Sequence, residues 1–231
     1  MFIIFSSFQE FTFYINYAME KNNITYKILS YPKIYRAFQQ LVSGKKPKSY
    51  SVIEKICNDF IKINGRKPVL LDLGCGEGKL CDWIHDICDY YGVDYSDDYL
   101  SYANEKYKNK GKFIKFDLSS SQAHTDLSKH WDIIISIGLL HHLANDDVLK
   151  VKKNFMDFNP NAIIFTIDPV LLEQQNIFAK FIVSRDRGSY VRKLYEYQEL
   201  LKNYQYHLDN FCRIPYNHIL FYQNIELKKY L

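Results

Sequence analysis

The sequence lacks any apolar run long enough to span a bilayer. Its first five residues are apolar, but Ser6 and Ser7 follow at once, and no basic segment of the kind found in signal peptides precedes them. We therefore predict neither an export signal nor a membrane segment. Residues 1–18 are weakly patterned and Met19 precedes a better-patterned stretch, so we expect either an alternative start there or an upstream extension.

Cysteine is also scarce, and the charge is nearly balanced. The five cysteines form no C-x-x-C pair, which favours reduced thiols in a cytoplasmic protein over disulfides or a metal site; they are Cys57, Cys75, Cys81, Cys88 and Cys212. The 30 basic and 26 acidic residues give a net charge of +4, without the clustered excess of a dedicated nucleic-acid binder. Repeats and low-complexity segments are absent.

The overall composition is typical of a globular protein with a large hydrophobic core. Of the 231 residues 47% are hydrophobic and 24% are charged. We predict one domain with additions: an N-terminal extension and helical cap at 1–66, and a core at 67–231 with an insertion at about 170–207. Helices are expected at 34–42 and from Ser51, whose S-x-x-E spacing to Glu54 resembles a capping box; the basic stretch 43–48 reads as the turn between them.

From residue 68 short apolar runs alternate with helical stretches. This alternation predicts an α/β fold, in which a doubly wound parallel sheet is covered by helices on both faces and binds ligands at the carboxyl ends of its strands. A closing strand is expected at 218–222 and another near Phe211. The five earlier strand candidates are 69–73, 90–94, 113–116, 132–137 and 162–167.

The first of these strands runs into a glycine-rich loop, VLLDLGCGEG, at residues 69–78. Glycines allow a sharp turn and a close approach of the backbone to a ligand. A dinucleotide fingerprint needs glycine at position 79, which is Lys79, and a Walker A loop needs glycine at 73 and Ser or Thr at 80, which are both leucine. The loop therefore does not fit the usual phosphate cradles.

Three acidic residues complete a nucleoside site around this loop. Asp72 ends the first strand, and Asp94 ends the second, where a carboxylate can accept hydrogen bonds from both ribose hydroxyls. Asp117 follows the third strand and can accept the exocyclic amine of adenine. Polar strand ends are common individually, but these spacings together indicate a nucleoside site without a phosphate cradle.

These motifs, in this order, resemble those of class I S-adenosylmethionine-dependent methyltransferases. The matching segments are D-L-G-C-G-E-G, G-V-D-Y-S, F-D-L and W-D-I-I-I-S-I-G-L-L-H-H-L, between residues 69 and 143. The resemblance implies a Rossmann-like, seven-stranded sheet with a reversed last strand and S-adenosylmethionine as cofactor.

The resemblance also implies roles for individual residues. Asp72 would orient the methionine ammonium and Asp94 would hold the ribose, while Asp117 and Leu118 would bracket the adenine. The remaining cofactor residues expected from the matched motifs are Gly74, Gly76, Gly78, Tyr95 and Ile137.

Two histidines follow the fourth strand, at the predicted mouth of the cleft. Orientation of a nucleophile can supply about 7 to 11 kcal/mol of a barrier, so a base is not obligatory for methyl transfer. His141 and His142 are the candidate bases, because an imidazole is easily poised near neutral pH. Paired histidines are also widespread in the resembled family as a structural helix-start feature, and both interpretations stay open.

The stretch after the fifth strand is rich in arginine. D-R-G-x-Y-V-R is similar to a subset of small-molecule methyltransferases in which this insertion lies over the active site. Arg187, Tyr190 and Arg192 could clamp an anionic acceptor, or the arginines could pair internally with Asp186.

A second segment, ahead of the core, resembles the N-terminal cap of the same subset. It reads Y-P-K-I-Y-R from Tyr31 to Arg36, and Tyr35 or Arg36 could reach the cofactor carboxylate. The alternative is that Tyr31 and Tyr35 only pack a helix.

Functions other than methylation of a small molecule are compatible with parts of the sequence to different degrees. Methylation of an adenine amine would need an Asn/Asp-Pro-Pro-Tyr/Phe motif where Ser136-Ile-Gly-Leu139 stands, and cytosine methylation would need a nucleophilic cysteine, whereas Cys75 lies in the cofactor loop. A transfer RNA or protein substrate, a non-catalytic cofactor-binding module, and a metal-dependent enzyme using Asp168 with Asp146 or Asp147 stay as alternatives. The sequence does not indicate the oligomeric state.

Overall fold

The computed structural model describes residues 47–119, 130–157, 159–175, 179, 180, 183, 188–210 and 217–231. The chain divides into two units, residues 1–45 and 46–231, and the described residues all belong to the second. The helix predicted at 34–42, together with Tyr35 and Arg36, lies outside the described residues.

The second unit alternates strands and helices, as the pattern predicted. Its strands are β1 (Val69–Leu73), β2 (Asp89–Asp94), β3 (Lys112–Lys115), β4 (Ile133–Ile137), β5 (Ile163–Leu171), β6 (Arg192–Lys193), β7 (Gln205–Asp209) and β8 (His218–Gln223). The α-helices whose bounds lie within the described residues are α4 (Lys48–Asn64), α5 (Cys81–Ile84), α6 (Asp97–Lys106), α8 (Asn145–Val151) and α10 (Leu194–Leu200). The described residues also form three short turns: η1 (Leu140–His142), the π-helical η2 (Lys152–Asp157) and η3 (Leu227–Lys229).

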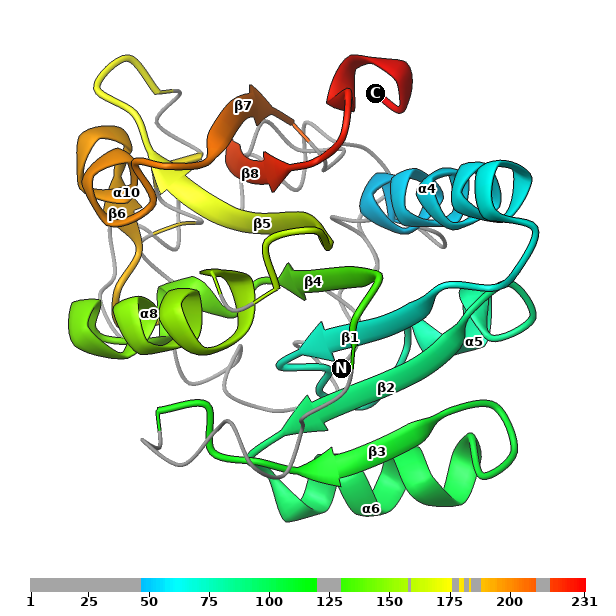
Figure 1. Cartoon of the computed structure of the whole chain (residues 1–231). Coiled ribbons are helices and arrows are strands. Elements are labelled where there is room, and N and C mark those ends of the chain that lie inside the picture. Colours follow the sequence, from blue (N-terminus) through cyan, green and yellow to red (C-terminus); the bar gives the residue numbers. More distant parts are fainter. Residues whose placement is uncertain are drawn as a thin grey trace, which may run out of the picture. The chain divides into compact units, whose positions relative to one another are not determined.

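The sheet has the order β3-β2-β1-β4-β5-β8-β7, with the short β6 beside the end of β5 (Figure 1). The strands from β3 to β5 are parallel, and β8 is antiparallel to both β5 and β7. The Rossmann-like α/β fold with a reversed last strand is therefore confirmed. Chain order reverses between β1 and β4, so the carboxyl ends of β1, β2, β4 and β5 form the edge where a ligand is expected.

Helices cover both faces of the sheet because successive strand residues point to opposite sides. In β1, Leu70 joins a core formed with α4, α5 and residues of α6, whereas Leu71 joins a core formed with α8, η2 and α10. Both leucines are fully buried. Strands buried on both faces explain the near-continuous apolar runs in the sequence.

Helix α4 begins earlier than the capping-box pattern predicted. It starts at Lys48 after Pro47, whose φ of −59° suits a helix entry, so Ser51 and Glu54 lie inside the helix and do not cap it. Its residues Val52, Ile53, Ile56 and Cys57 pack against the sheet within the second unit. The boundary predicted at residue 66 thus separates a helix from the core it belongs to, and the unit begins at residue 46 instead.

The end of the chain also differs in detail from expectation. The strand expected near Phe211 is β7 at 205–209, while β8 matches the closing strand expected at 218–222. Four cysteines in the described residues are free thiols: Cys57, Cys75, Cys81 and Cys88. None of the helices described has the length and apolar character needed to cross a bilayer.

Candidate functional site

Backbone conformation and backbone hydrogen bonds fix the glycine loop that follows β1. Gly74, Gly76 and Gly78 have φ values of +71°, +53° and +71°, a region that other residues rarely adopt. The N–H groups of Gly74 and Cys75 both donate to the carbonyl of Val93 at the end of β2, at 2.9 and 3.0 Å. The loop is thereby fixed between the two strands that would flank a ligand.

Two of the three glycines are closely packed, and the middle one is not. A Cβ on Gly74 would lie 2.8 Å from Leu139 Cδ1, and one on Gly78 would lie 2.6 Å from Phe113 Cε1, so both glycines serve close packing. A Cβ on Gly76 would meet nothing within 4 Å. The crest of the loop therefore faces open space, into which a ligand can approach the backbone.

Asp94 links this loop to the start of α6. One carboxylate oxygen accepts the N–H of Gly76 and the other accepts the N–H of Ser96, both at 2.9 Å. A carboxylate oxygen has two acceptor positions, so each keeps one for a further donor. Asp94 is half-buried at the edge of the sheet, and its geometry fits a carboxylate that holds a pair of ribose hydroxyls.

Asp72 lies buried beneath the same loop. It accepts a short hydrogen bond from the hydroxyl of Tyr90. Burial raises its pKa to about 7, an effect that the Tyr90 hydrogen bond opposes and the nearby charge of Asp94 reinforces. Burial, together with the negative charge of Asp72, also raises the pKa of Tyr50 at the start of α4. A cationic ligand group at this point would stabilise the ionised carboxylate.

Asp117 lies past β3, at the far side of the predicted nucleoside site. Its Oδ1 accepts the backbone N–H and the hydroxyl of Ser119 at 2.9 and 2.6 Å, and these bonds lower its pKa. It is exposed and remains an acceptor at neutral pH. Leu118 beside it is buried, while the Tyr95 side chain is 70% exposed. This arrangement suits a flat base with one exocyclic amine.

The histidine turn η1 lies directly after β4. The turn into it uses Gly138, with a φ of +67°, whose N–H donates to the carbonyl of Ile167 at 2.7 Å. Ile137, the last residue of β4, is half-buried. His141 Nδ1 lies 2.9 Å from Asp168 Oδ1, and the backbone N–H of His141 donates to the same oxygen at 3.1 Å. Asp168, on β5, therefore fixes both the ring and the backbone of His141.

The two histidines have different surroundings. His141 is 5% exposed, whereas His142 is exposed, and their ring centroids are 4.2 Å apart. An imidazole whose Nδ1–H donates to a carboxylate is held in one tautomer with Nε2 as the basic nitrogen. His141 thus has the geometry of an oriented base, and His142 flanks it.

The segment after the fifth strand packs onto this turn. The N–H of Tyr190 donates to the carbonyl of His141 at 2.9 Å. The Arg192 guanidinium donates to the carbonyls of Leu140 and Leu143 at 2.8 and 2.6 Å. It also donates to the Tyr190 carbonyl and to Asn145 Oδ1.

These contacts correct the interpretation of Arg192 as part of a substrate clamp. The residue is 4% exposed, and its donors are directed to the carbonyls of Leu140, which begins η1, and Leu143, which follows it. Its partners among the described residues are backbone carbonyls and an amide, while Asp186, the acidic residue expected from the sequence, lies outside the described residues. Tyr190 is 44% exposed and stays available to a ligand, and Arg187 lies outside the described residues.

A metal centre built on Asp168 gains no support from these residues. Asp168 Oδ1 is hydrogen-bonded to His141 Nδ1, and Asp147 accepts a hydrogen bond from Lys150 at 2.9 Å. Within the ranges that the structure describes, no three His, Cys, Asp or Glu side chains are grouped to hold a metal ion.

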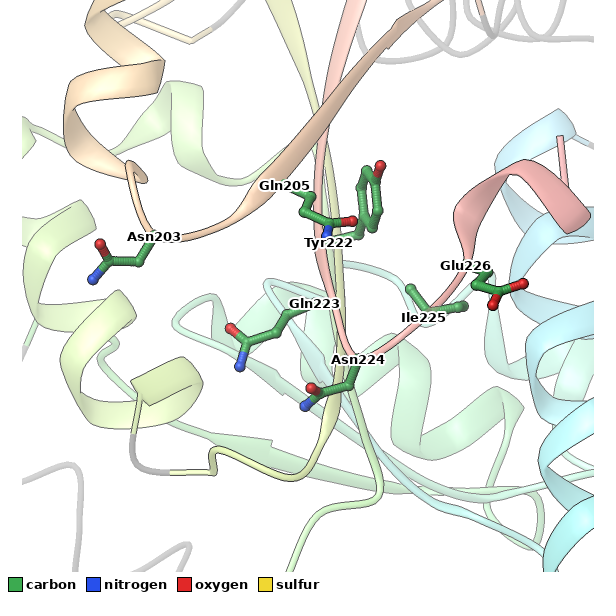
Figure 2. Close-up of a pocket in the computed structure, with 7 residues that line it drawn as sticks. All are labelled: Asn203, Gln205, Tyr222, Gln223, Asn224, Ile225 and Glu226. Atoms are coloured by element: carbon green, nitrogen blue, oxygen red, sulfur yellow. The ribbon is translucent and has the colours of Figure 1, made fainter.

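A separate pocket of about 430 Å³ lies away from this site (Figure 2). Gln205 begins β7 and Gln223 ends β8, so the pocket lies at the amino ends of the parallel strands, opposite the glycine loop. Its lining is rich in amides: Asn203, Gln205, Tyr222, Gln223, Asn224, Ile225 and Glu226.

Several residues of the site were not predicted from the sequence. Tyr90 and Tyr50 adjoin Asp72, and neither follows a recognisable motif. Asp168 was considered only as a metal ligand, although its place directly after the apolar run 162–167 marks it as a strand-end polar residue. Its pairing with His141 depends on the register of β4 and β5.

Comparison with known proteins finds a family model and relatives that resemble part of this chain. Residues 70–158 match the family model described as a methyltransferase domain. A ubiquinone biosynthesis O-methyltransferase of Brucella anthropi is 25% identical over 118 residues, which is 48% of this chain and 47% of the relative. The match thus spans about half the length of that curated relative.

Solved structures share the fold at lower identity. The plantazolicin methyltransferase BpumL in complex with SAH is 16% identical, with a TM-score of 0.58 over 93% of this chain and 99% of that chain. Human N-acetylserotonin methyltransferase in complex with SAM is also 16% identical, with a TM-score of 0.56 over 77% of this chain and 52% of that chain.

Proposed function

We propose that this chain, which carries a methyltransferase domain at residues 70–158, transfers a methyl group from S-adenosylmethionine to an oxygen or nitrogen atom of a small-molecule acceptor. The matched range contains the glycine loop, Asp94, Asp117 and the histidine turn. S-adenosylmethionine is the cofactor of this enzyme, and its sulfonium supplies an electrophilic methyl group.

The observation that carries the proposal is the pairing of an open glycine loop with a buried carboxylate. Asp72 is 4% exposed, and its pKa of about 7 reflects the cost of an ionised carboxylate at that position. A methionine ammonium nearby offsets that cost, whereas a phosphate would add to it. Asp94 and Asp117 then hold the ribose and the adenine amine. The site therefore fits a nucleoside attached to a cationic chain and does not fit a diphosphate.

The protein contributes mainly orientation and exclusion of water to the reaction. Alignment of acceptor and methyl can account for about 7 to 11 kcal/mol of the barrier. His141 removes the proton from the acceptor through Nε2, because Asp168 holds Nδ1–H and stabilises the imidazolium that forms. Such a base is worth roughly 10²- to 10⁴-fold in rate.

The burial of His141 supports a small acceptor. The segment at Gly188 and Tyr190 lies against His141, and a polymer would have to displace it to bring a nucleophile to the ring. The names of two similar proteins point the same way, since one is an O-methyltransferase of ubiquinone biosynthesis and another an N-acetylserotonin methyltransferase. Tyr190, exposed at this segment, is the residue placed to contact the acceptor.

An assay with methyl-labelled S-adenosylmethionine tests the proposal. The full chain is incubated with separate small-molecule, RNA and protein fractions, and the His141→Ala variant is run in parallel. Label in the small-molecule fraction, reduced at least 100-fold in the variant, supports the proposal. Label in RNA or protein contradicts the acceptor class. Cofactor binding without transfer to any fraction would instead indicate a non-catalytic binding module.

A further inference from the structure

Three buried polar atoms close to the His141–Asp168 pair lack hydrogen-bond partners among the residues that the structure describes. They are Ser136 Oγ on β4, and Thr166 Oγ1 and Asp168 Oδ2 on β5. The three residues are 1%, 3% and 1% exposed. Native proteins rarely leave buried polar atoms unpaired, so three in one place require an explanation.

The sheet register places the three side chains on one face of β4 and β5. Ser136 and Thr166 are direct partners in the parallel pairing of β4 with β5, so their side chains point to the same face. Thr166 and Asp168 are two residues apart on one strand and share that face as well. The next residues of this face on either side, Ile164 and Val170, are buried and apolar.

The chemistry of the three atoms is complementary to one water molecule. An ionised carboxylate oxygen only accepts, whereas each hydroxyl can donate. A water molecule placed among them would donate one O–H to Asp168 Oδ2 and accept the hydroxyl protons of Ser136 and Thr166. This gives the water three hydrogen bonds, the number that buried waters typically make.

We propose that Ser136 and Thr166 are positioning residues that hold a buried water against Asp168 and thereby fix the carboxylate that orients His141. The water satisfies Oδ2 while Oδ1 receives the imidazole and the backbone N–H of His141. Loss of a hydroxyl removes a hydrogen bond that fixes the water and, through it, the orientation of the carboxylate, so Oδ1 is held less firmly in place against the Nδ1–H of His141. The catalytic consequence rests on the proposed role of His141, but the water site itself does not.

Isosteric variants of the full chain separate this role from simple packing. Thr166→Val keeps the shape and removes the hydroxyl, while Thr166→Ser keeps the hydroxyl. Ile164→Val is the matched control, because it trims the same face of the same strand without touching a polar atom. Histidine ¹⁵N spectra report the tautomer of His141, and urea denaturation reports stability.

We expect Thr166→Val to lower the urea midpoint and to shift the ¹⁵N signals of His141 toward a mixture of tautomers. Thr166→Ser should restore the wild-type spectrum, and Ile164→Val should lower the midpoint with no change in tautomer. In methyl transfer, Thr166→Val should reduce kcat about tenfold, part of the rate that a general base contributes, and leave KM for the cofactor unchanged.

The opposite pattern overturns the inference. A hydroxyl that has no partner is better replaced by a methyl group, so Thr166→Val would then raise the urea midpoint and leave the His141 spectrum unchanged. Both readouts are independent of turnover. A chain that shows the expected tautomer shift but does not bind S-adenosylmethionine would refute the proposed function and keep the water site.

Discussion

Gly188 and His141 are packed so closely that no side chain fits at position 188. A Cβ built on Gly188 would lie 1.9 Å from Cδ2 of the imidazole and 2.6 Å from the His141 carbonyl oxygen. The backbone after the fifth strand thus lies directly on the ring that we propose as the base. The position of this segment and the position of the imidazole are therefore coupled.

This packing predicts the effect of Gly188→Ala. The added methyl group must displace either the imidazole or the segment, and overpacking of this kind costs about 1 to 3 kcal/mol of unfolding free energy. We expect kcat to fall at least tenfold with little change in the Kd of S-adenosylmethionine, measured by steady-state kinetics and calorimetry. Unchanged kcat would show that the position of His141 does not govern the reaction.

Arg192 also holds this segment against the η1 turn, which predicts a loss of stability in Arg192→Lys. Lysine keeps the charge but cannot reach the carbonyls of Leu140 and Leu143 together. We expect the unfolding free energy to fall by about 2 kcal/mol, the scale of hydrogen bonds that involve a charged group. Full stability in urea titration combined with a raised KM for the acceptor would favour the substrate-clamp interpretation instead.

Asp72→Asn should raise stability at alkaline pH. The pKa of Asp72 is raised to about 7, so the folded chain retains a proton that the unfolded chain loses near its ordinary value of 3.8. The contribution is fully present below about pH 4 and is lost as the pH rises toward about 7. The variant avoids this loss, which is at most about 4 kcal/mol at about 1.4 kcal/mol for each pKa unit.

Urea titrations of wild type and Asp72→Asn at pH 5 and pH 8 measure this difference. Asp132→Asn is a suitable contrast, because Asp132 lies at the other edge of the sheet and its bonds to Arg66 lower its pKa in spite of burial. That variant should lose stability at both pH values. An Asp72→Asn chain less stable than wild type at pH 8 would contradict the account of Asp72.

The affinity for the cofactor should depend on pH through the ionisation of Asp72. A methionine ammonium favours ionised Asp72, so the affinity for S-adenosylmethionine should rise between pH 6 and 7 and level off above the pKa of about 7. Calorimetric titration at several pH values measures this directly. In Asp72→Asn the affinity should be lower and nearly independent of pH over that range, and an equally steep rise in the variant would assign the effect to another group.

Asp94→Ala should weaken S-adenosylmethionine binding by about 1.5 to 3 kcal/mol, the scale of hydrogen bonds to a charged group. Because Asp94 also accepts the N–H groups of Gly76 and Ser96, we expect a smaller loss of stability as well. Asp94→Asn separates the two effects, since an amide oxygen can still accept one of the backbone bonds. Unchanged affinity in Asp94→Ala would refute the ribose assignment.

The sequence predicted local features of the fold well and the contacts between distant segments poorly. The strands were found because buried parallel strands are apolar throughout, and the loop was found because glycines at positive φ stand at fixed spacing. The start of α4 was missed because Pro47 provides a helix entry that resembles a turn in sequence.

In the site, too, the sequence predicted the local features and not the contacts between distant segments. Asp72, Asp94 and Asp117 lie at strand ends and could be located by counting residues. The role of Asp168 depends on how β5 is aligned with β4, and the contacts of Arg192 depend on where the following segment lies. Neither relationship leaves a signal in residue spacing, so the sequence suggested a metal ligand and a substrate clamp instead.

Calorimetric competition among nucleotides tests the central claim most directly. The account predicts that S-adenosylmethionine and its demethylated product bind the full chain with one site per molecule, and that NAD and ATP neither bind nor compete. Saturation by NAD or ATP, with no heat from the sulfonium compound, would contradict a site formed by an open glycine loop and a buried carboxylate.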